Sequence, residues 1–332
     1  MRLDLKALIT WSGLVASVFS PAISDAQTRL RLSTFVNEVD IRHKGFEKFA
    51  ELVAQKTSGR VRIDIFPSGQ LHGFTESVDA IRGGVTDMSS IQPGEQRLPC
   101  YRATALYPAV VSLDRQLDLD AAYSALVAPE AAKINLVPVM NSNFSYDQEW
   151  WFKGPIEDLG KLEGKLVRSV GPLTSAMIEA WGGKPVFIAP KELYQSAERG
   201  VVNGINMGVA TFSSWKLWNV MPYMIKAGLF YGNTIFMMNK GKYDALSPQD
   251  QQALLAAGRE AEAWLKPRYE TWIDEQVGNA IMKSGATVVS LTRQRRVELI
   301  NSVQGKWQKD SDAACGAEVA QRFRALMAAH AR

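Results

Sequence analysis

Side chains that could perform catalysis are few and scattered in this chain. The three histidines, His43, His72 and His330, belong to no His-Glu-x-x-His pair and to no Cys/His cluster, so the sequence predicts no metal site. The stretch Ser213-Ser214-Trp215-Lys216 reads Ser-x-x-Lys, but the companion motifs of penicillin-recognising enzymes are missing. Neither a phosphate-binding loop nor a dinucleotide fingerprint nor a Gly-x-Ser-x-Gly motif occurs. The sequence therefore favours a binding protein without a cofactor over an enzyme.

Arg168 is a candidate for ligand binding because it ends the short apolar stretch Leu166-Val167. Open α/β sheets bind ligands beyond the carboxyl ends of their strands. A planar guanidinium pairs with a carboxylate through two parallel charge-assisted hydrogen bonds, which lysine cannot reproduce. Most arginines are exposed, so position alone favours a surface ion pair over a ligand contact. Asn206 lies at another expected strand end, where it is either a turn residue or a second ligand contact.

The elements that position these residues alternate between strand and helix. In the first half, the apolar periodicity predicts strands at 30–34, 61–65, 88–91 and 134–140, and helices from 46 to Gly59, at 75–82 and at 120–128. In the second half it predicts strands at 165–169, 186–188 and near 205, and helices at 173–181 and 190–199. Both halves are therefore expected to be α/β units with right-handed crossovers.

A long helix is expected after Ser247, which is a plausible N-cap with Pro248 at the first helical position. Helix-forming residues continue to about Lys283, interrupted only by Pro267, which should kink the helix. Two successive helices are the alternative, because uncapped helices of this length are unusual in globular domains. The strand at 235–238 is expected to return to the first lobe, with the long helix crossing both lobes.

The first 26 residues have the pattern of a cleavable signal peptide. Arg2 and Lys6 precede an apolar run at 7–19, and the small residues Ser24 and Ala26 follow. The alternative is a membrane anchor, but the run is shorter than the roughly 20 apolar residues that a spanning helix needs. The pattern predicts export to the periplasm.

Charge and size narrow the class further. The chain has 332 residues and a net charge of +4, with acidic and basic residues interspersed, which argues against a nucleic-acid partner. A chain of this length exceeds one ordinary hydrophobic core, so two lobes are expected. Cys100 and Cys315 would lie in a compartment that permits disulfides, but the pairing of distant cysteines is left open by the sequence.

Nine short motifs follow one another along the chain after residue 26. They are His43-Lys44-Gly45-Phe46, Gly59-Arg60-Val61, Gly84-Val85-Thr86-Asp87, Pro155-Ile156-Glu157-Asp158-Leu159, Leu162-Glu163-Gly164-Lys165, Glu192-Leu193-Tyr194, Gly200-Val201-Val202-Asn203-Gly204, Met238-Asn239-Lys240 and Leu246-Ser247-Pro248. In their order and spacing, these motifs resemble those of one family, the periplasmic solute receptors of tripartite ATP-independent (TRAP) transporters. The likeness covers nearly all of the chain after residue 26.

This resemblance implies a two-lobed α/β clamshell that closes on an organic acid and delivers it to integral-membrane permease subunits. It assigns lobe I to residues 27–148 and 234–270, and lobe II to residues 149–233 and 271–332. It also implies that Arg168 clamps the ligand carboxylate, that Asn206 hydrogen-bonds the ligand, and that the receptor is a monomer. A binding protein of an ABC importer and a periplasmic enzyme are the alternatives.

One position departs from the family pattern. Many acid-binding members carry a second arginine upstream of the one matched by Arg168, where this chain has Tyr146 or Asp147. A second ligand carboxylate would then be buried without a partner, which predicts a monocarboxylate ligand whose donor group could contact Asp147. Trp215 and Trp218, three apart on an expected helix, and Tyr231 are further aromatic residues near the expected cleft. Of these, Trp215 and Tyr231 are candidates to line the pocket.

Overall fold

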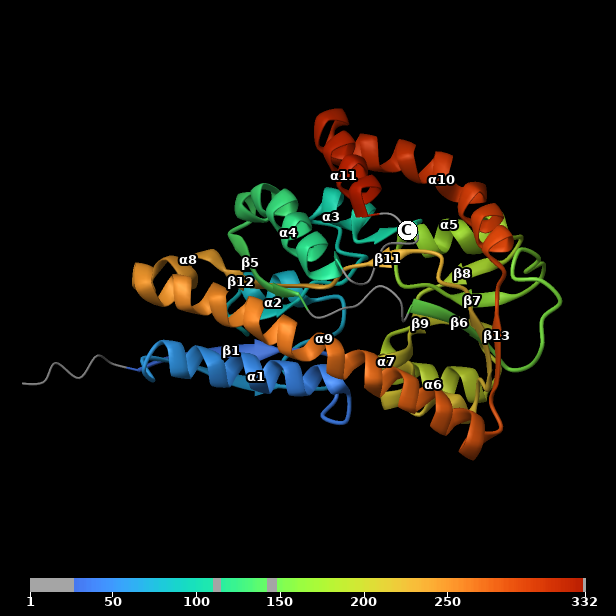
Figure 1. Cartoon of the computed structure of the whole chain (residues 1–332), viewed down its shortest axis with the longest axis horizontal. Helices are drawn as coiled ribbons and strands as arrows, with labels where there is room; N and C mark the ends of the chain where they lie inside the picture. The colour runs from blue at the N-terminus through green and yellow to red at the C-terminus, as the bar shows by residue number, and fades with distance from the viewer. Residues whose placement is uncertain (1–26, 110–114, 142–147, 331–332) are drawn as a thin grey trace, which may run out of the picture.

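The first lobe is built on a five-stranded sheet (Figure 1). The computed structural model describes residues 27–109, 115–141 and 148–330. The strand order is β2 (Val61–Phe66), β1 (Thr28–Ser33), β3 (Met88–Ser90), β12 (Ile235–Asn239) and β5 (Leu136–Asn141). β1 is parallel to β2 and β3, whereas β12 is antiparallel to β3 and β5. The predicted return of the segment at 235–238 to the first sheet is therefore confirmed.

Helix α1 (Ile41–Lys56) covers this sheet because its apolar residues recur on one side. Phe46, Phe49 and Val53 are buried in the same core as Leu32 of β1. The other helices of this half are α2 (Ser77–Arg82), α3 (Pro99–Thr104), α4 (Gln116–Lys133) and the short α8 (Lys240–Asp244). The helix ends at Lys56, before the predicted end at Gly59, and the chain leaves it through Ser58 and Gly59, which have left-handed φ angles of 51° and 79°.

The second lobe is built on a six-stranded sheet. Its order is β13 (Thr287–Ser290), β10 (Tyr223–Lys226), β6 (Gln148–Phe152), β9 (Gly204–Gly208), β7 (Leu166–Arg168) and β8 (Lys184–Val186). Helices α5 (Pro172–Ala180), α6 (Pro190–Glu198) and α7 (Val209–Ser214) accompany it, followed by the 3₁₀ turn η3 (Leu217–Asn219). The periodicity did not identify β6, β10 or β13. All five residues of β6 are buried, so this strand lacks the alternation of buried and exposed positions by which a strand is predicted from sequence.

The long helix α9 (Pro248–Ser284) runs from the first lobe to the second (Figure 1). It packs against α1 and β5 at one end and against α7 and η3 toward the other. Ser247 caps its start by accepting a hydrogen bond from the Asp250 N–H. The helix continues through Pro267, so one helix is correct and the two-helix alternative is wrong. The strands β11 (Tyr231–Gly232) and β4 (Leu106–Tyr107) form a separate antiparallel pair close to the chain crossing between β10 and β12.

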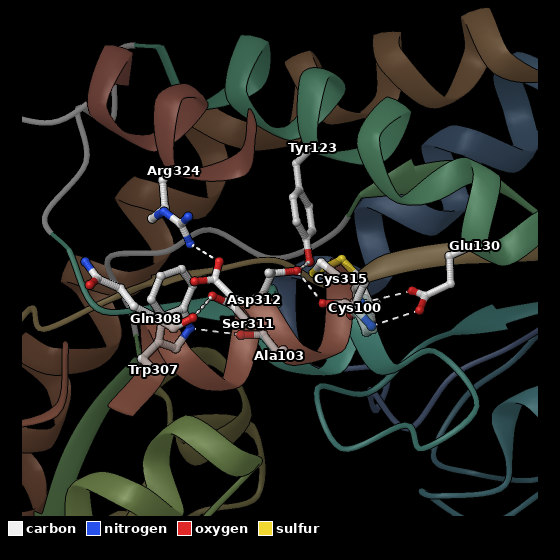
Figure 2. The surroundings of a disulfide bond; sticks show 12 residues. Cys100, Ala103, Tyr123, Glu130, Trp307, Gln308, Ser311, Asp312, Cys315 and Arg324 are labelled. Carbon is white, nitrogen blue, oxygen red and sulfur yellow. Dashed lines mark hydrogen bonds and ion pairs between the residues drawn. A yellow bond between two sulfur atoms is a disulfide. The ribbon is translucent and has the colours of Figure 1, made fainter. Parts of the chain in front are cut away.

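Two C-terminal helices, α10 (Arg293–Cys315) and α11 (Ala317–His330), close the fold. α10 packs against α3 and α5, and α11, although expected in the second lobe, packs against α4, which itself packs on β5 of the first sheet. A disulfide joins Cys100 of α3 to Cys315 of α10, the pairing that the sequence had left open (Figure 2). No helix among the described residues is long and apolar enough to cross a membrane.

Candidate functional site

A small cavity of about 50 Å³ lies where the two lobes meet. Both lobes and the β4 segment contribute to its wall. The lining residues are Phe35, Arg42, Phe74, Gln92, Pro93, Leu106, Gln148, Arg168, Val170, Pro190, Met207, Gly208, Thr211 and Thr234. A wider hollow of about 730 Å³ shares Phe74, Gln92 and Val170 with this cavity. The two spaces together form a cleft between the lobes with a narrow inner end.

Arg168 lies at the inner end of the cleft, at the carboxyl end of β7. Its side chain is buried, and the residue is only 1% exposed. Its Nη1 donates to the Asn206 carbonyl oxygen at 2.9 Å, and its Nε donates to the Ile188 carbonyl oxygen at 3.2 Å. A guanidinium has five N–H groups, so three of them remain for another acceptor. This geometry leaves part of the guanidinium available to the cavity that it lines.

The charge of Arg168 is not balanced by a carboxylate among the described residues. Burial lowers the pKa of the Arg168 guanidinium to about 9, which leaves it protonated at neutral pH. A buried charge without a counter-ion is costly, and an anionic ligand would offset that cost. Among the described residues, the cavity therefore has a positive charge without a carboxylate partner, at the position where the family resemblance implied a carboxylate clamp.

Asn206 lies beside Arg168 but does not line the cavity. Its side chain is fully buried, and its Nδ2 donates to the Glu149 carbonyl oxygen at 3.0 Å. Its Oδ1 accepts a hydrogen bond from Gln148 Nε2 at 3.1 Å, and Gln148 itself lines the cavity. In this arrangement the Asn206 backbone positions Arg168, while its side chain orients Gln148. Its direct contact with a ligand remains a prediction.

The other predicted site residues are dispersed. Tyr146 and Asp147 lie outside the described residues. Trp215 does not line the inner cavity but lines a hollow of about 30 Å³ that shares Phe35, Phe74 and Pro190 with it. Trp215 and Trp218 were expected on one helix, which is wrong, because α7 ends at Ser214 and Lys216 adopts a left-handed φ of 56° before η3.

Tyr231 does not line the inner cavity but belongs to a buried polar cluster near the chain crossings. Its hydroxyl donates to the Asp120 carboxylate, which also accepts from Asn233 Nδ2 at 2.8 Å. Asn233 Nδ2 contacts Asn141 Oδ1 at 3.1 Å, and the Asn141 N–H donates to Glu262 Oε1 at 2.7 Å. Burial raises the pKa of Asp120 well above its ordinary range. This cluster connects α4, β5 and α9 with the segment between β11 and β12.

Glu262 should make stability depend on pH. Burial raises its pKa from the usual 4.5 to about 7, so the folded protein retains this proton more tightly than the unfolded chain. The free energy of unfolding should therefore be largest below about pH 4.5 with respect to this group and fall as the pH rises to about 7. Glu262→Gln keeps an acceptor for the Asn141 N–H but cannot ionise. We expect the variant to match the native protein near pH 4 and to exceed it by up to about 3 kcal/mol at pH 8.

Denaturant unfolding of both proteins at the two pH values measures this difference. A difference that does not change between pH 4 and pH 8 would contradict the assignment.

Arg42 is a cavity residue that the sequence analysis did not identify. Its Nε and Nη2 donate to the two carboxylate oxygens of Asp40 at 3.0 and 2.6 Å, and Nη2 also donates to Thr211 Oγ1 of α7 at 2.6 Å. The guanidinium lies 5.7 Å from the ring centroid of Phe35. The only local signal was the short spacing of Asp40 and Arg42 at the start of α1. The contact with Thr211 joins the first lobe to the second.

Comparison with known proteins gives consistent matches over most of the chain. The family model described as "Bacterial extracellular solute-binding protein, family 7" matches residues 32–312. The 2,3-diketo-L-gulonate-binding periplasmic protein YiaO of Escherichia coli is 24% identical over 261 residues, covering 75% of this chain and 76% of YiaO. The C4-dicarboxylate-binding protein DctB of Bacillus subtilis is 22% identical over 257 residues, covering 76% and 73% of the two chains.

Solved structures show the same fold. A TRAP periplasmic solute-binding protein from Desulfovibrio salexigens with bound orotic acid has a TM-score of 0.83 at 18% identity, covering 91% of this chain and 99% of its own. One from Sulfitobacter sp. NAS-14.1 with bound β-D-galacturonate has a TM-score of 0.79 at 21% identity, covering 90% and 99%. The two-lobed architecture with its long helix is therefore confirmed.

Proposed function

Because the chain belongs to family 7 of the bacterial extracellular solute-binding proteins, the TRAP solute receptors, we propose that it captures a small monocarboxylate in the periplasm. The buried guanidinium of Arg168, which lines the interlobe cavity and has no carboxylate partner among the described residues, carries this proposal. The bound acid would then be delivered to the membrane permease subunits of a TRAP transporter by a monomeric receptor. The proposal assigns no reaction to the chain.

The charge of the cavity supports a single ligand carboxylate. Arg168 and Arg42 are the charged residues among the described lining residues, and Arg42 is already paired with Asp40. The net charge of the described lining residues is therefore close to one positive unit. A second carboxylate would be buried without a counter-ion, which is costly. The names of the two relatives give different numbers of ligand carboxylates, because one binds 2,3-diketo-L-gulonate and the other a C4 dicarboxylate. The number of carboxylates expected for this chain therefore depends on the charges that line its own cavity.

The rest of the wall favours a compact ligand with both apolar and polar faces. Phe35, Phe74, Leu106 and Met207 offer apolar contacts. The polar groups are the amides of Gln92 and Gln148 and the hydroxyl of Thr234, which can donate to and accept from hydroxyl or carbonyl substituents. Galacturonate and orotate, the ligands of the two structural neighbours, each combine one carboxylate with a ring that carries hydroxyl or carbonyl groups. They are therefore suitable first probes.

A thermal-shift screen followed by calorimetric titration tests the proposal. The informative ligands are matched pairs that differ by one carboxylate, such as galactonate with galactarate and succinamate with succinate, together with galacturonate and orotate. We expect the tightest ligand to be a monocarboxylate, and a ligand at a hundredfold excess over its Kd should stabilise the protein by about 2.7 kcal/mol. If galactarate or succinate binds more tightly than every monocarboxylate, the single-carboxylate proposal is wrong.

A further inference from the structure

We propose that Asp40 sets the charge selectivity of the ligand site by neutralising Arg42 in the cavity wall. This inference rests on the proposed function, because it concerns the same cavity. The wall contains two guanidinium groups, those of Arg168 and Arg42. Only Arg42 has a carboxylate partner among the described residues. Asp40 thereby reduces a site that could hold two carboxylates to a site that holds one.

The geometry of the pair is that of a strong bidentate interaction. Arg42 Nε and Nη2 each donate to a different oxygen of Asp40, at 3.0 and 2.6 Å. The two side chains are buried, with exposures of 5% for Arg42 and 0% for Asp40. Parallel charge-assisted hydrogen bonds of this kind are about twice as strong as neutral ones, and burial of the pair reduces its screening by salt. A ligand carboxylate would have to displace Asp40 to reach this face of Arg42.

The protein holds Asp40 in place without help from a ligand. Asp40 is the N-cap of α1, and its Oδ1 accepts a hydrogen bond from the Arg42 N–H at 2.9 Å. The Ser214 hydroxyl of the second lobe donates to its Oδ2 at 3.4 Å. Asparagine caps helices as well as aspartate does. The capping and charge-neutralising roles of Asp40 can therefore be separated by one isosteric substitution.

Arg42 also connects the two lobes. An effect of its charge on ligand selectivity must therefore be distinguished from an effect of this contact on the closure of the lobes. Its Nη2 donates to Thr211 Oγ1 at 2.6 Å, and Asn37 Nδ2 donates to the Ser214 carbonyl oxygen at 3.0 Å nearby. Thr211→Val would remove the first contact without changing the charge of the site. If Arg42 served closure alone, Asp40→Asn and Thr211→Val would change the affinities for monoacids and diacids by the same factor.

The test is calorimetric titration of the full receptor with galactonate and galactarate and with succinamate and succinate. For Asp40→Asn we expect the affinity for the diacid relative to its monoacid to rise at least tenfold, because a second carboxylate can now pair with Arg42. Thr211→Val should leave this ratio unchanged. The double variant Asp40→Asn/Arg42→Gln, which removes both charges, should return the ratio to the native value. An unchanged ratio in a folded Asp40→Asn variant, checked by circular dichroism, would overturn the inference.

If Asp40→Asn does not fold, Arg42→Gln alone provides a second test. It leaves the Asp40 carboxylate at the cavity wall, so galacturonate should bind at least tenfold more weakly than to the native protein. Undiminished binding would overturn the inference. Arg168→Ala tests the proposed function separately from the role of Asp40. If this variant binds galacturonate as tightly as the native protein, the proposed carboxylate clamp is wrong, irrespective of the result for Asp40→Asn.

Discussion

Arg168→Ala is expected to weaken monocarboxylate binding by roughly 30-fold to several thousandfold, which corresponds to about 2–5 kcal/mol. The reason is that the variant would leave the buried ligand carboxylate without its charged partner. Arg168→Lys should also weaken binding. A lysine ammonium is a point charge and cannot hold the Ile188 and Asn206 carbonyl oxygens while pairing bidentately with a carboxylate. Calorimetric titration with the tightest monocarboxylate of the screen measures both effects.

Arg322→Ala is a matched control for this experiment. Arg322, on α11, is exposed and lines neither the inner cavity nor the wider outer hollow. Its removal changes the net charge of the protein as Arg168→Ala does, but should leave the affinity within a few-fold of the native value. Equal losses in the two variants would indicate general electrostatic attraction, and unchanged affinity in Arg168→Lys would disprove the clamp.

Removing the Cys100–Cys315 disulfide is expected to lower the free energy of unfolding by several kcal/mol. The two cysteines are separated by 215 residues, and closing so long a loop in the unfolded chain is worth about 5 kcal/mol in the chain-entropy model. The double variant Cys100→Ser/Cys315→Ser avoids a remaining reactive thiol. Denaturant unfolding under oxidising conditions should show a clear decrease in the midpoint.

Other contacts of α10 should preserve the native fold and ligand binding in this variant. Trp307 Nε1 donates to the Ala103 carbonyl oxygen at 2.8 Å on the first-lobe side (Figure 2). On the second-lobe side, Arg295 pairs with Asp158 at 2.7 Å. Neither cysteine lines the ligand cavity, so ligand affinity should change little. A midpoint equal to that of the native protein, with the free-thiol content of the native protein shown to be zero, would contradict a stabilising role.

Much of the fold was predictable because it depends on local patterns. Alternation in β1 and the apolar spacing of α1 identify these elements, since each pattern repeats over a few residues. The long helix α9 was identified from its cap at Ser247 and its composition. Arg168 was predicted as a ligand contact because the end of an apolar strand is a place where α/β proteins bind ligands. The family resemblance then raised that general position to a specific hypothesis about a carboxylate.

What the sequence could not determine depends on contacts between distant segments. Arg42 meets Thr211 across 169 positions and Cys100 meets Cys315 across 215, and no local periodicity records such pairings. The orientation of Asn206 toward β6, rather than toward the cavity, likewise follows from strand pairing. Whether an arginine is available to a ligand depends on which carboxylate the packed lobes place beside it. Arg168 and Arg42 are the same residue type in the sequence. Their availability to a ligand differs because folding places Asp40 against only one of them.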